Sequence, residues 1–182
     1  LKKTSYMCGI VAVTGYKKAL PLLINGLEKL EYRGYDSAGI AIINSENNSI
    51  SCKKAEGKLK NLISNLNHHN IPGTVGIGHT RWATHGKPEV KNAHPHTDSS
   101  GNIAVVQNGI IENFQDLKNK LKGEGIIFNS DTDTEVIPHL IQRELSTLSK
   151  LNLENNGSTL LVAVRNVLSD LEGSYALRSF MV

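Results

Sequence analysis

The sequence predicts an α+β domain whose strands pair in antiparallel fashion. Apolar residues recur with both helical and strand-like periods, and the two kinds of segment are mixed along the chain. Residues 44–48 form a turn-rich link between two short apolar runs, as in a β-hairpin. The chain has 182 residues, which suits one domain with a core of its own.

The first part of the chain is predicted to hold strands and two helices. Residues 9–13 are a short β-branched run, typical of a buried strand. Over residues 19–30, leucine and isoleucine recur every three or four positions and give a helix one apolar face, with Pro21 in its first turn. The other expected elements are strands at 40–43, 50–53 and 75–80 and a helix at 59–66. Within the last of these strands, Gly76 and Gly78 indicate a close approach of the backbone.

A long irregular stretch, residues 81–102, follows and carries Trp82 and three histidines. Long loops inside a compact domain are usually functional or disordered. After it, the pattern predicts a strand at 103–106 that ends at Gln107-Asn108-Gly109. The remaining expected elements are a helix at 114–122, a strand at 126–128 and a terminal strand from residue 175.

Capping signals predict where two further helices begin. Thr132 and Glu135 have the spacing of a capping box, with Thr132 as the N-cap. Ser158 is expected to cap the last helix. The residues expected to face inward are Val136, Ile137, Leu140 and Ile141 on the first of these helices and Leu160, Leu161, Val164, Val167 and Leu168 on the second.

Composition and charge exclude several classes of protein. Hydrophobic residues make up 39% and charged residues 20%, which is typical of a soluble globular protein. The net charge is only +3 and the lysine pairs are scattered, so nucleic-acid binding is not expected. No apolar stretch reaches the length of a membrane span. The two cysteines cannot form a disulfide framework of the secreted kind, which favours a cytoplasmic location.

Cys8 is the first candidate for chemistry because it directly follows Met7. Translation from Met7 and removal of that methionine would leave Cys8 at the N-terminus. Its own α-amino group, which titrates near neutrality, could then take the thiol proton and pass it to a leaving amine. The alternative is a small buried hydrophobe beside a strand.

A second group of candidates lies in residues 79–86. Arg81 offers a planar fork suited to a carboxylate, and Thr84 and His85 could add hydrogen bonds. Trp82 could shield a site from water. The alternative is an ordinary surface arginine and a packed tryptophan.

Asn108-Gly109 and Asp133 each have two interpretations. Asn-Gly between apolar runs usually marks a tight turn, yet an asparagine amide beside a glycine N–H also makes a pair of oxyanion donors. Asp133 would either favour a helix N-terminus or hold a cationic amine.

A metal site is the competing hypothesis for the histidine-rich region. The possible ligands are His79, His85, His94, His96 and Asp98. Their spacing matches no known zinc pattern, so neither a metal nor another cofactor is expected.

Six segments, in one unbroken order, together resemble the class II glutamine amidotransferases of the N-terminal nucleophile hydrolase superfamily. Within that family they are most similar to the glutamine–fructose-6-phosphate aminotransferase group. The segments are residues 7–11, 31–39, 79–86, 92–96, 108–113 and 130–135.

The resemblance implies a four-layer αββα sandwich of two antiparallel sheets and a role for each candidate residue. Cys8 would be the nucleophile and its α-amine the base, with Asn108 and the Gly109 N–H as the oxyanion hole. The substrate glutamine would be held through its carboxylate by Arg81, Thr84 and His85 and through its amine by Asp133. Trp82 would lie in a loop that closes over the site. Cys52 has no matching role and is expected to serve packing.

The resemblance also sets expectations about the extent of the chain. Residues 1–7 would be a leader that is absent or removed, and residues 8–182 would be a partial glutaminase domain. The sugar isomerase domains of the family, which bind fructose 6-phosphate, have no counterpart here. The family would place an apolar residue where Arg178 stands, which favours a truncated or frame-shifted gene product, or a fragment. Two alternatives follow: a non-catalytic remnant of such an enzyme, or a metal-dependent hydrolase.

Overall fold

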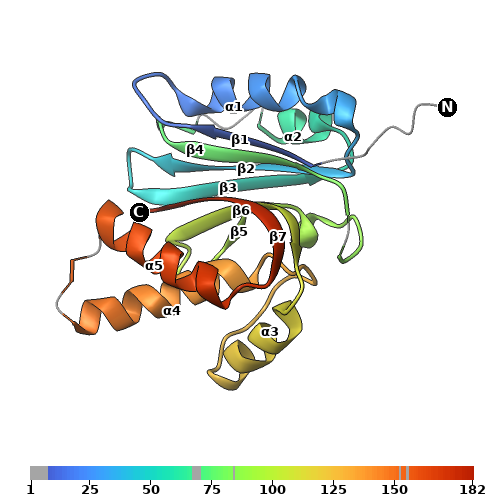
Figure 1. Cartoon of the computed structure of the whole chain (residues 1–182). Helices are drawn as coiled ribbons and strands as arrows, with labels where there is room; N and C mark the ends of the chain where they lie inside the picture. Colours follow the sequence, from blue (N-terminus) through green and yellow to red (C-terminus); the bar gives the residue numbers. More distant parts are fainter. Residues whose placement is uncertain (1–7, 67–70, 84, 152, 155) are drawn as a thin grey trace.

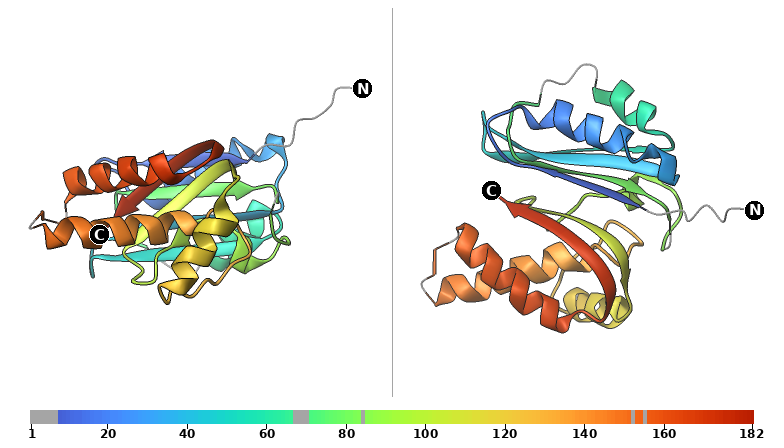
Figure 2. Two further views of the ribbon diagram at one scale, coloured as in Figure 1. Left: turned by 60° about the horizontal axis from the view of Figure 1, so that its bottom comes forward. Right: turned by 45° about the horizontal axis from the view of Figure 1, so that its top comes forward.

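The computed structural model describes residues 8–66, 71–83, 85–151, 153–154 and 156–182. Four layers are visible in Figure 1: two facing sheets in the middle, with helices covering the outer face of each. Helices α1 (Ala19–Glu28) and α2 (Leu59–Leu66) cover one sheet, and α4 (Val136–Lys150) and α5 (Gly157–Asp170) cover the other. Helix α3 (Phe114–Gly123), which is shorter than α4 and α5, lies at one end of the part of the molecule that α4 and α5 cover (Figure 2). The expected α+β sandwich with αββα layers is therefore confirmed.

The first sheet has the strand order β1-β4-β2-β3, with every neighbouring pair antiparallel. Its strands are β1 (Gly9–Val13), β2 (Ser37–Asn44), β3 (Ser49–Glu56) and β4 (Gly76–Arg81). The hairpin predicted around residues 44–48 is confirmed as β2–β3, which extends further than the apolar runs alone indicated.

Close packing explains the two glycines of β4. A side chain at Gly76 would meet Leu23 of α1 and the Ala41 carbonyl oxygen, each at 2.9 Å, and one at Gly78 would meet Leu27 at 3.1 Å. Helix α1 therefore rests directly on the backbone of β4, as the glycine pattern predicted.

The second sheet has the order β5-β6-β7 and is also antiparallel. Its strands are β5 (His96–Thr97), β6 (Ile103–Ile111) and β7 (Gly173–Met181). The long irregular stretch thus contributes one short strand, β5, as well as a 3-10 turn at Val90–Asn92.

Three apolar clusters fill the spaces between the layers. One lies between the first sheet and α1 and α2, and a larger one lies between the second sheet and α4 and α5. The third lies between the sheets and is made of smaller residues, including Ala41, Ile77, Ala104 and Val106. Three buried histidines, His79, His94 and His96, also lie in the interior, in contact with one another.

Several local predictions were wrong. No strand forms at 126–128, because Ile126 and Phe128 pack against the helical cluster instead of pairing with a sheet. The strand expected to end before Asn108 continues to Ile111, so Asn108-Gly109 is not a turn. The helix expected at 19–30 ends at Glu28 and is followed by a 3-10 turn at Glu31–Arg33.

Both capping predictions also need correction. Thr132 does not cap α4; its hydroxyl bonds Ser130 and His96, while the Glu135 carboxylate accepts bonds from the Asn129 and Ser130 backbone N–H groups. The N-cap of α5 is Asn156, whose side chain accepts bonds from the Ser158 and Thr159 N–H groups.

Helix α5 begins at Gly157, one residue before Ser158, and two residues of its predicted inner face are exposed. Leu161 and Leu168 are 60% and 37% exposed, whereas Ala163 and Val167 are buried. Leu160 and Val164 pack against the core, as expected. The inward residues of α4 are confirmed, since all four are fully buried.

Candidate active site

Cys8 lies immediately before β1, at the edge of the first sheet. The first residue of β1, Gly9, pairs with Thr80 of β4, and the Gly9 N–H donates to the Thr80 hydroxyl at 3.1 Å. This pairing brings the Cys8 sulfur to the end of β4, where it accepts a bond from the Trp82 N–H at 3.1 Å. Residues 74 positions apart in sequence therefore meet through one strand pair.

A cavity of about 220 Å³ opens beside the Cys8 sulfur. Its walls come from both sheets and from the segment that precedes α4. The residues that line it are Cys8, His79, Arg81, Trp82, His94, Gln107, Asn108, Gly109, Ile110, Asp133 and Thr134. Six of the eight residues predicted as a site from the sequence are therefore gathered around one small cavity: Cys8, Arg81, Trp82, Asn108, Gly109 and Asp133.

Asn108 and Gly109 face Cys8 from the second sheet. The Asn108 side-chain amide donates to the Cys8 carbonyl oxygen at 3.1 Å, across 100 positions of sequence. Gly109 has φ +121°, which disfavours a side chain, and a Cβ there would collide with the Ser174 carbonyl oxygen of β7. A glycine is needed here because β7 approaches closely, whereas the sequence alone suggested a turn.

Arg81 ends β4 and is almost completely buried. Its guanidinium donates to the His85 carbonyl oxygen and lies 3.9 Å from the Asp36 carboxylate. The Asp36 carboxylate also accepts a bond from the Ala83 N–H at 2.5 Å, which shapes the loop after β4. Among the described residues, Arg81 Nη1 has no hydrogen-bond partner.

Asp133 approaches the cavity from the opposite side. One of its carboxylate oxygens accepts the Ile111 N–H at 2.8 Å, and the other lies 3.9 Å from His85 Nδ1. That ring nitrogen is buried and has no hydrogen-bond partner within the part of the chain that the structure describes. His85 thus lies between Arg81 and Asp133, while Thr84 is outside the described residues.

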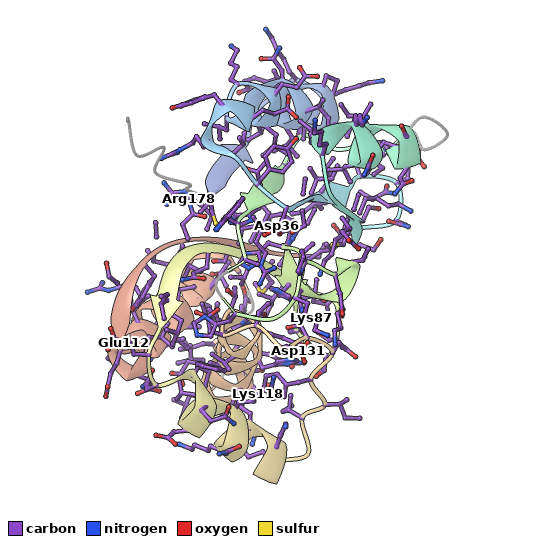
Figure 3. All side chains as sticks on the ribbon, turned by 90° about the vertical axis from the view of Figure 1, so that its right-hand side faces the viewer. Asp36, Lys87, Glu112, Lys118, Asp131 and Arg178 are labelled. Carbon is purple, nitrogen blue, oxygen red and sulfur yellow. The ribbon has the colours of Figure 1, made fainter. Side chains whose placement is uncertain are left out.

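Trp82 stands at the mouth of the cavity and is 38% exposed. Figure 3 shows Asp36 at the junction between the two halves of the molecule, with Lys87, Asp131 and Lys118 following down the same side.

Burial raises the pKa of the Cys8 thiol, although the Trp82 N–H and the nearby Arg81 charge act in the opposite direction. A thiol with a raised pKa is a weak nucleophile at neutral pH. The surrounding side chains alone therefore do not create a thiolate, and the site needs a base.

The histidines stack instead of converging on a common point. The rings of His79 and His94 lie parallel with centroids 4.2 Å apart, and His96 meets His94 edge-on at 4.9 Å. Burial lowers the pKa of His79 to about 4 and lowers those of His94 and His96 well below the ordinary value. In the described ranges, no three side chains of His, Cys, Asp or Glu are arranged to hold a metal ion.

The sequence reasoning did not anticipate Gln107, Ile110, Thr134 or Asp36 in or beside the site. Asp36 belongs to the segment at residues 31–39, and Gln107 lies next to Asn108. Ile110 could have been found if the strand had been continued to Ile111, because alternate side chains share a face and Ile110 follows Asn108 by two positions. Cys52 does not line the cavity, and its sulfur lies 3.9 Å from the Pro95 carbonyl oxygen.

The fold and the placement of the cysteine define an N-terminal nucleophile hydrolase of the amidotransferase type. Glutamine phosphoribosylpyrophosphate amidotransferase from B. subtilis, solved with ADP and GMP, superposes with a TM-score of 0.74 and 29% identity. The match covers 94% of this chain and 35% of that one. A structure described as the allosteric regulatory enzyme of purine biosynthesis matches equally well.

The chain belongs to the glutamine amidotransferase domain family, whose model matches residues 45–152. Curated relatives extend the similarity to 94% of the chain. Glutamine–fructose-6-phosphate aminotransferases (isomerizing) from Thermosynechococcus vestitus and Gloeobacter violaceus are 53% and 54% identical to it. The relative of that name from Pyrococcus horikoshii is 53% identical. The chain spans about a quarter of the length of these relatives (26–27%).

No helix in the described part of the chain combines the length and apolar character needed to cross a bilayer.

Proposed function

We propose that this domain hydrolyses glutamine to glutamate and ammonia, with Cys8 as the nucleophile. The observation that carries the proposal is the convergence of Cys8, Asn108, Arg81 and Asp133 on one cavity of about 220 Å³. These residues provide one complementary group for each charge of a glutamine zwitterion and a donor for the oxyanion that forms during attack.

The base in this proposal is the α-amino group of Cys8 itself. It takes the thiol proton, and the sulfur then attacks the carboxamide carbon of glutamine. The C–N bond breaks, the departing nitrogen receives the proton, and ammonia leaves. Water hydrolyses the thioester and releases glutamate. The active form must therefore begin at Cys8, with residues 1–7 removed.

Two buried nitrogens without a hydrogen bond support the assignment of the substrate carboxylate. Among the described residues, Arg81 Nη1 and His85 Nδ1 make no hydrogen bond, although Asp36 and Asp133 respectively lie 3.9 Å from them, and buried polar groups are normally hydrogen-bonded. A carboxylate between them would accept from both. Thr84 is proposed to join them on the family resemblance, and Asp133 to hold the ammonium group. The exposed ring of Trp82 is proposed to close over bound substrate.

We further propose that the ammonia serves the synthesis of an amino sugar from fructose 6-phosphate, as the names of the relatives suggest. That reaction would require a sugar-isomerase domain as a partner. The glutaminase step itself needs no metal or cofactor, because the nucleophile, base and donors all belong to the chain. A cytoplasmic location agrees with the two unpaired cysteines.

The first experiment is the intact mass of the purified protein before and after treatment with an electrophilic glutamine analogue. We expect a mass that begins at Cys8 and a gain of one adduct. Cys8→Ala should abolish both the adduct and ammonia release, and Cys52→Ala is the matched control that keeps them. A chain that retains residues 1–7, forms no adduct and releases no ammonia would instead identify a non-catalytic remnant.

A further inference from the structure

Asn108 presents a side chain with two chemically opposite ends to its surroundings. The amide nitrogen donates hydrogen bonds and the amide oxygen accepts them, so a half-turn of the group exchanges a donor for an acceptor. In an oxyanion hole this difference decides the sign of the interaction: the N–H stabilises the developing charge, and the oxygen would repel it. Some feature of the site must therefore fix the orientation.

One end of the amide is fixed by Cys8. The Cys8 carbonyl oxygen can only accept, so the Asn108 group 3.1 Å away must be the nitrogen. This contact uses one of the two N–H bonds of the amide. The second N–H remains for a ligand in the cavity that Asn108 lines.

The other end of the amide is held by His79. The distance from His79 Nε2 to Asn108 Oδ1 is 2.7 Å, and an amide oxygen needs a donor. His79 must therefore carry its proton on Nε2. The remaining nitrogen, Nδ1, is buried without a partner in the described structure, which leaves a weak acceptor unsatisfied but no N–H.

His79 is itself held in place from three directions. It lies in β4 between Ile10 of β1 and Gly39 of β2, and its side chain is fully buried. Its ring stacks on that of His94 at 4.2 Å with 16° between the planes. His94 Nδ1 in turn accepts the Gln107 N–H at 3.3 Å, and Gln107 precedes Asn108 in β6. Asn108, His79, His94 and Gln107 therefore form a closed ring of contacts, in which each residue touches the next. This ring joins the two sheets.

We infer that His79 is a positioning residue for the reaction: its Nε2–H holds the Asn108 amide with the nitrogen directed at the oxyanion. This inference rests on the proposed glutaminase function and adds a residue that does not touch the substrate in that mechanism. Because Arg81 and Asp133 would bind the α-carboxylate and α-ammonium groups, away from the reacting carboxamide, loss of the His79 contact should slow the catalytic step and leave substrate binding nearly intact.

The test compares kcat and KM for glutamine in His79→Leu, His79→Gln and Asn108→Ala. We expect kcat of His79→Leu to fall at least about 10-fold, as the loss of one hydrogen bond to a positioned group implies, with KM within about twofold of the parent. His79→Gln keeps a nitrogen donor near the Nε2 position and should restore most of the rate. His139→Leu is the matched control, because His139 is equally buried but lies in α4, away from the cavity.

The double variant His79→Leu with Asn108→Ala separates positioning from a general packing effect. If His79 acts through Asn108, the double variant should be no slower than Asn108→Ala alone, within about threefold. Losses that multiply, or a normal kcat in His79→Leu, would overturn the inference. Thermal unfolding of every variant shows whether the fold persists.

A measurement that needs no turnover separates this inference from the proposed function. Ring-nitrogen NMR of the resting protein should show His79 protonated on Nε2 and bare on Nδ1. If the parent fails to hydrolyse glutamine, the proposed function fails, and the NMR result still decides the geometry. A proton on Nδ1 with a bare Nε2 would overturn the positioning role.

Discussion

Arg81 and Asp133 bring opposite charges into a small, largely buried cavity. Buried charges are costly unless they are paired or hydrogen-bonded. Arg81 is only partly compensated, because Asp36 lies 3.9 Å away and the bond to the His85 carbonyl oxygen uses one arm of its fork. The other arm, Nη1, makes no hydrogen bond among the described residues and lies 3.9 Å from Asp36, so a substrate carboxylate could complete its hydrogen bonding.

This arrangement predicts the effect of Arg81→Lys. A lysine keeps the charge but loses the planar fork, so kcat/KM for glutamine should fall about 10- to 100-fold, the equivalent of one charged hydrogen bond. Most of the change should appear in KM. The control substrate is 4-aminobutanamide, which lacks the α-carboxylate, and the two enzymes should process it equally. An unchanged KM for glutamine would contradict the assigned role of Arg81.

The start of α5 shows how one residue sets the position of a whole helix. Asn156 has extended backbone angles, and its side-chain oxygen accepts from the N–H groups of Ser158 and Thr159, each at 3.0 Å. The helix therefore begins at Gly157. Its predicted inner face is confirmed at Leu160, Val164 and Val167 and was wrong at Leu161 and Leu168, which are exposed, while Ala163 is buried in their place.

Replacing the cap should destabilise the domain by a measurable amount. Asn156→Ala removes both bonds and should lower the free energy of unfolding by about 1 kcal/mol, the usual cost of losing an N-cap. Ser158→Ala is the matched control, because only the backbone N–H of Ser158 takes part in the cap, and it should cost less than about 0.5 kcal/mol. Urea denaturation of the two variants measures both values. A larger effect at Ser158 would restore the cap first predicted from the sequence.

At the scale of the whole molecule, the two sheets are joined by apolar contacts and by buried histidines. His79 extends from the first sheet and His94 precedes β5 of the second, and their rings stack between the layers. Burial keeps both rings neutral in the folded protein. The packing of one sheet on the other therefore depends on groups that bind protons once they reach water.

This packing predicts acid sensitivity. Below about pH 6.5 the unfolded chain protonates these histidines, whereas folded His79 resists protonation until about pH 4. The unfolded state then binds more protons, so stability must fall as the pH drops through this window, by up to about 1.4 kcal/mol per pH unit for each histidine. Urea denaturation across the window measures the slope, and His94→Gln should reduce it. A free energy of unfolding that stays constant down to pH 5 would contradict the prediction.

Much of this protein could be predicted from sequence because the relevant signals are local. The apolar face of a helix such as α4 can be recognised from the spacing of apolar residues over a few turns. Strands such as β1 and β4 can be recognised as short runs that contain β-branched residues or glycines. The candidate site residues were identifiable from their side-chain chemistry, and the resemblance added the roles proposed for them. The resemblance also implied the layered sandwich, which the structure confirms.

Only the tertiary structure decided the features that depend on distant partners. Asn108-Gly109 lies within a strand because β7 pairs beside it, and the Cys8 contact with Asn108 spans 100 positions. His79 reaches Asn108 from the other sheet, 29 positions away. Glu135 binds the backbone before α4 in place of the predicted cap. The physical reason is that composition and periodicity report a residue's near neighbours in the chain, whereas the orientation of a buried polar group is set by whichever partners the packed layers bring to it.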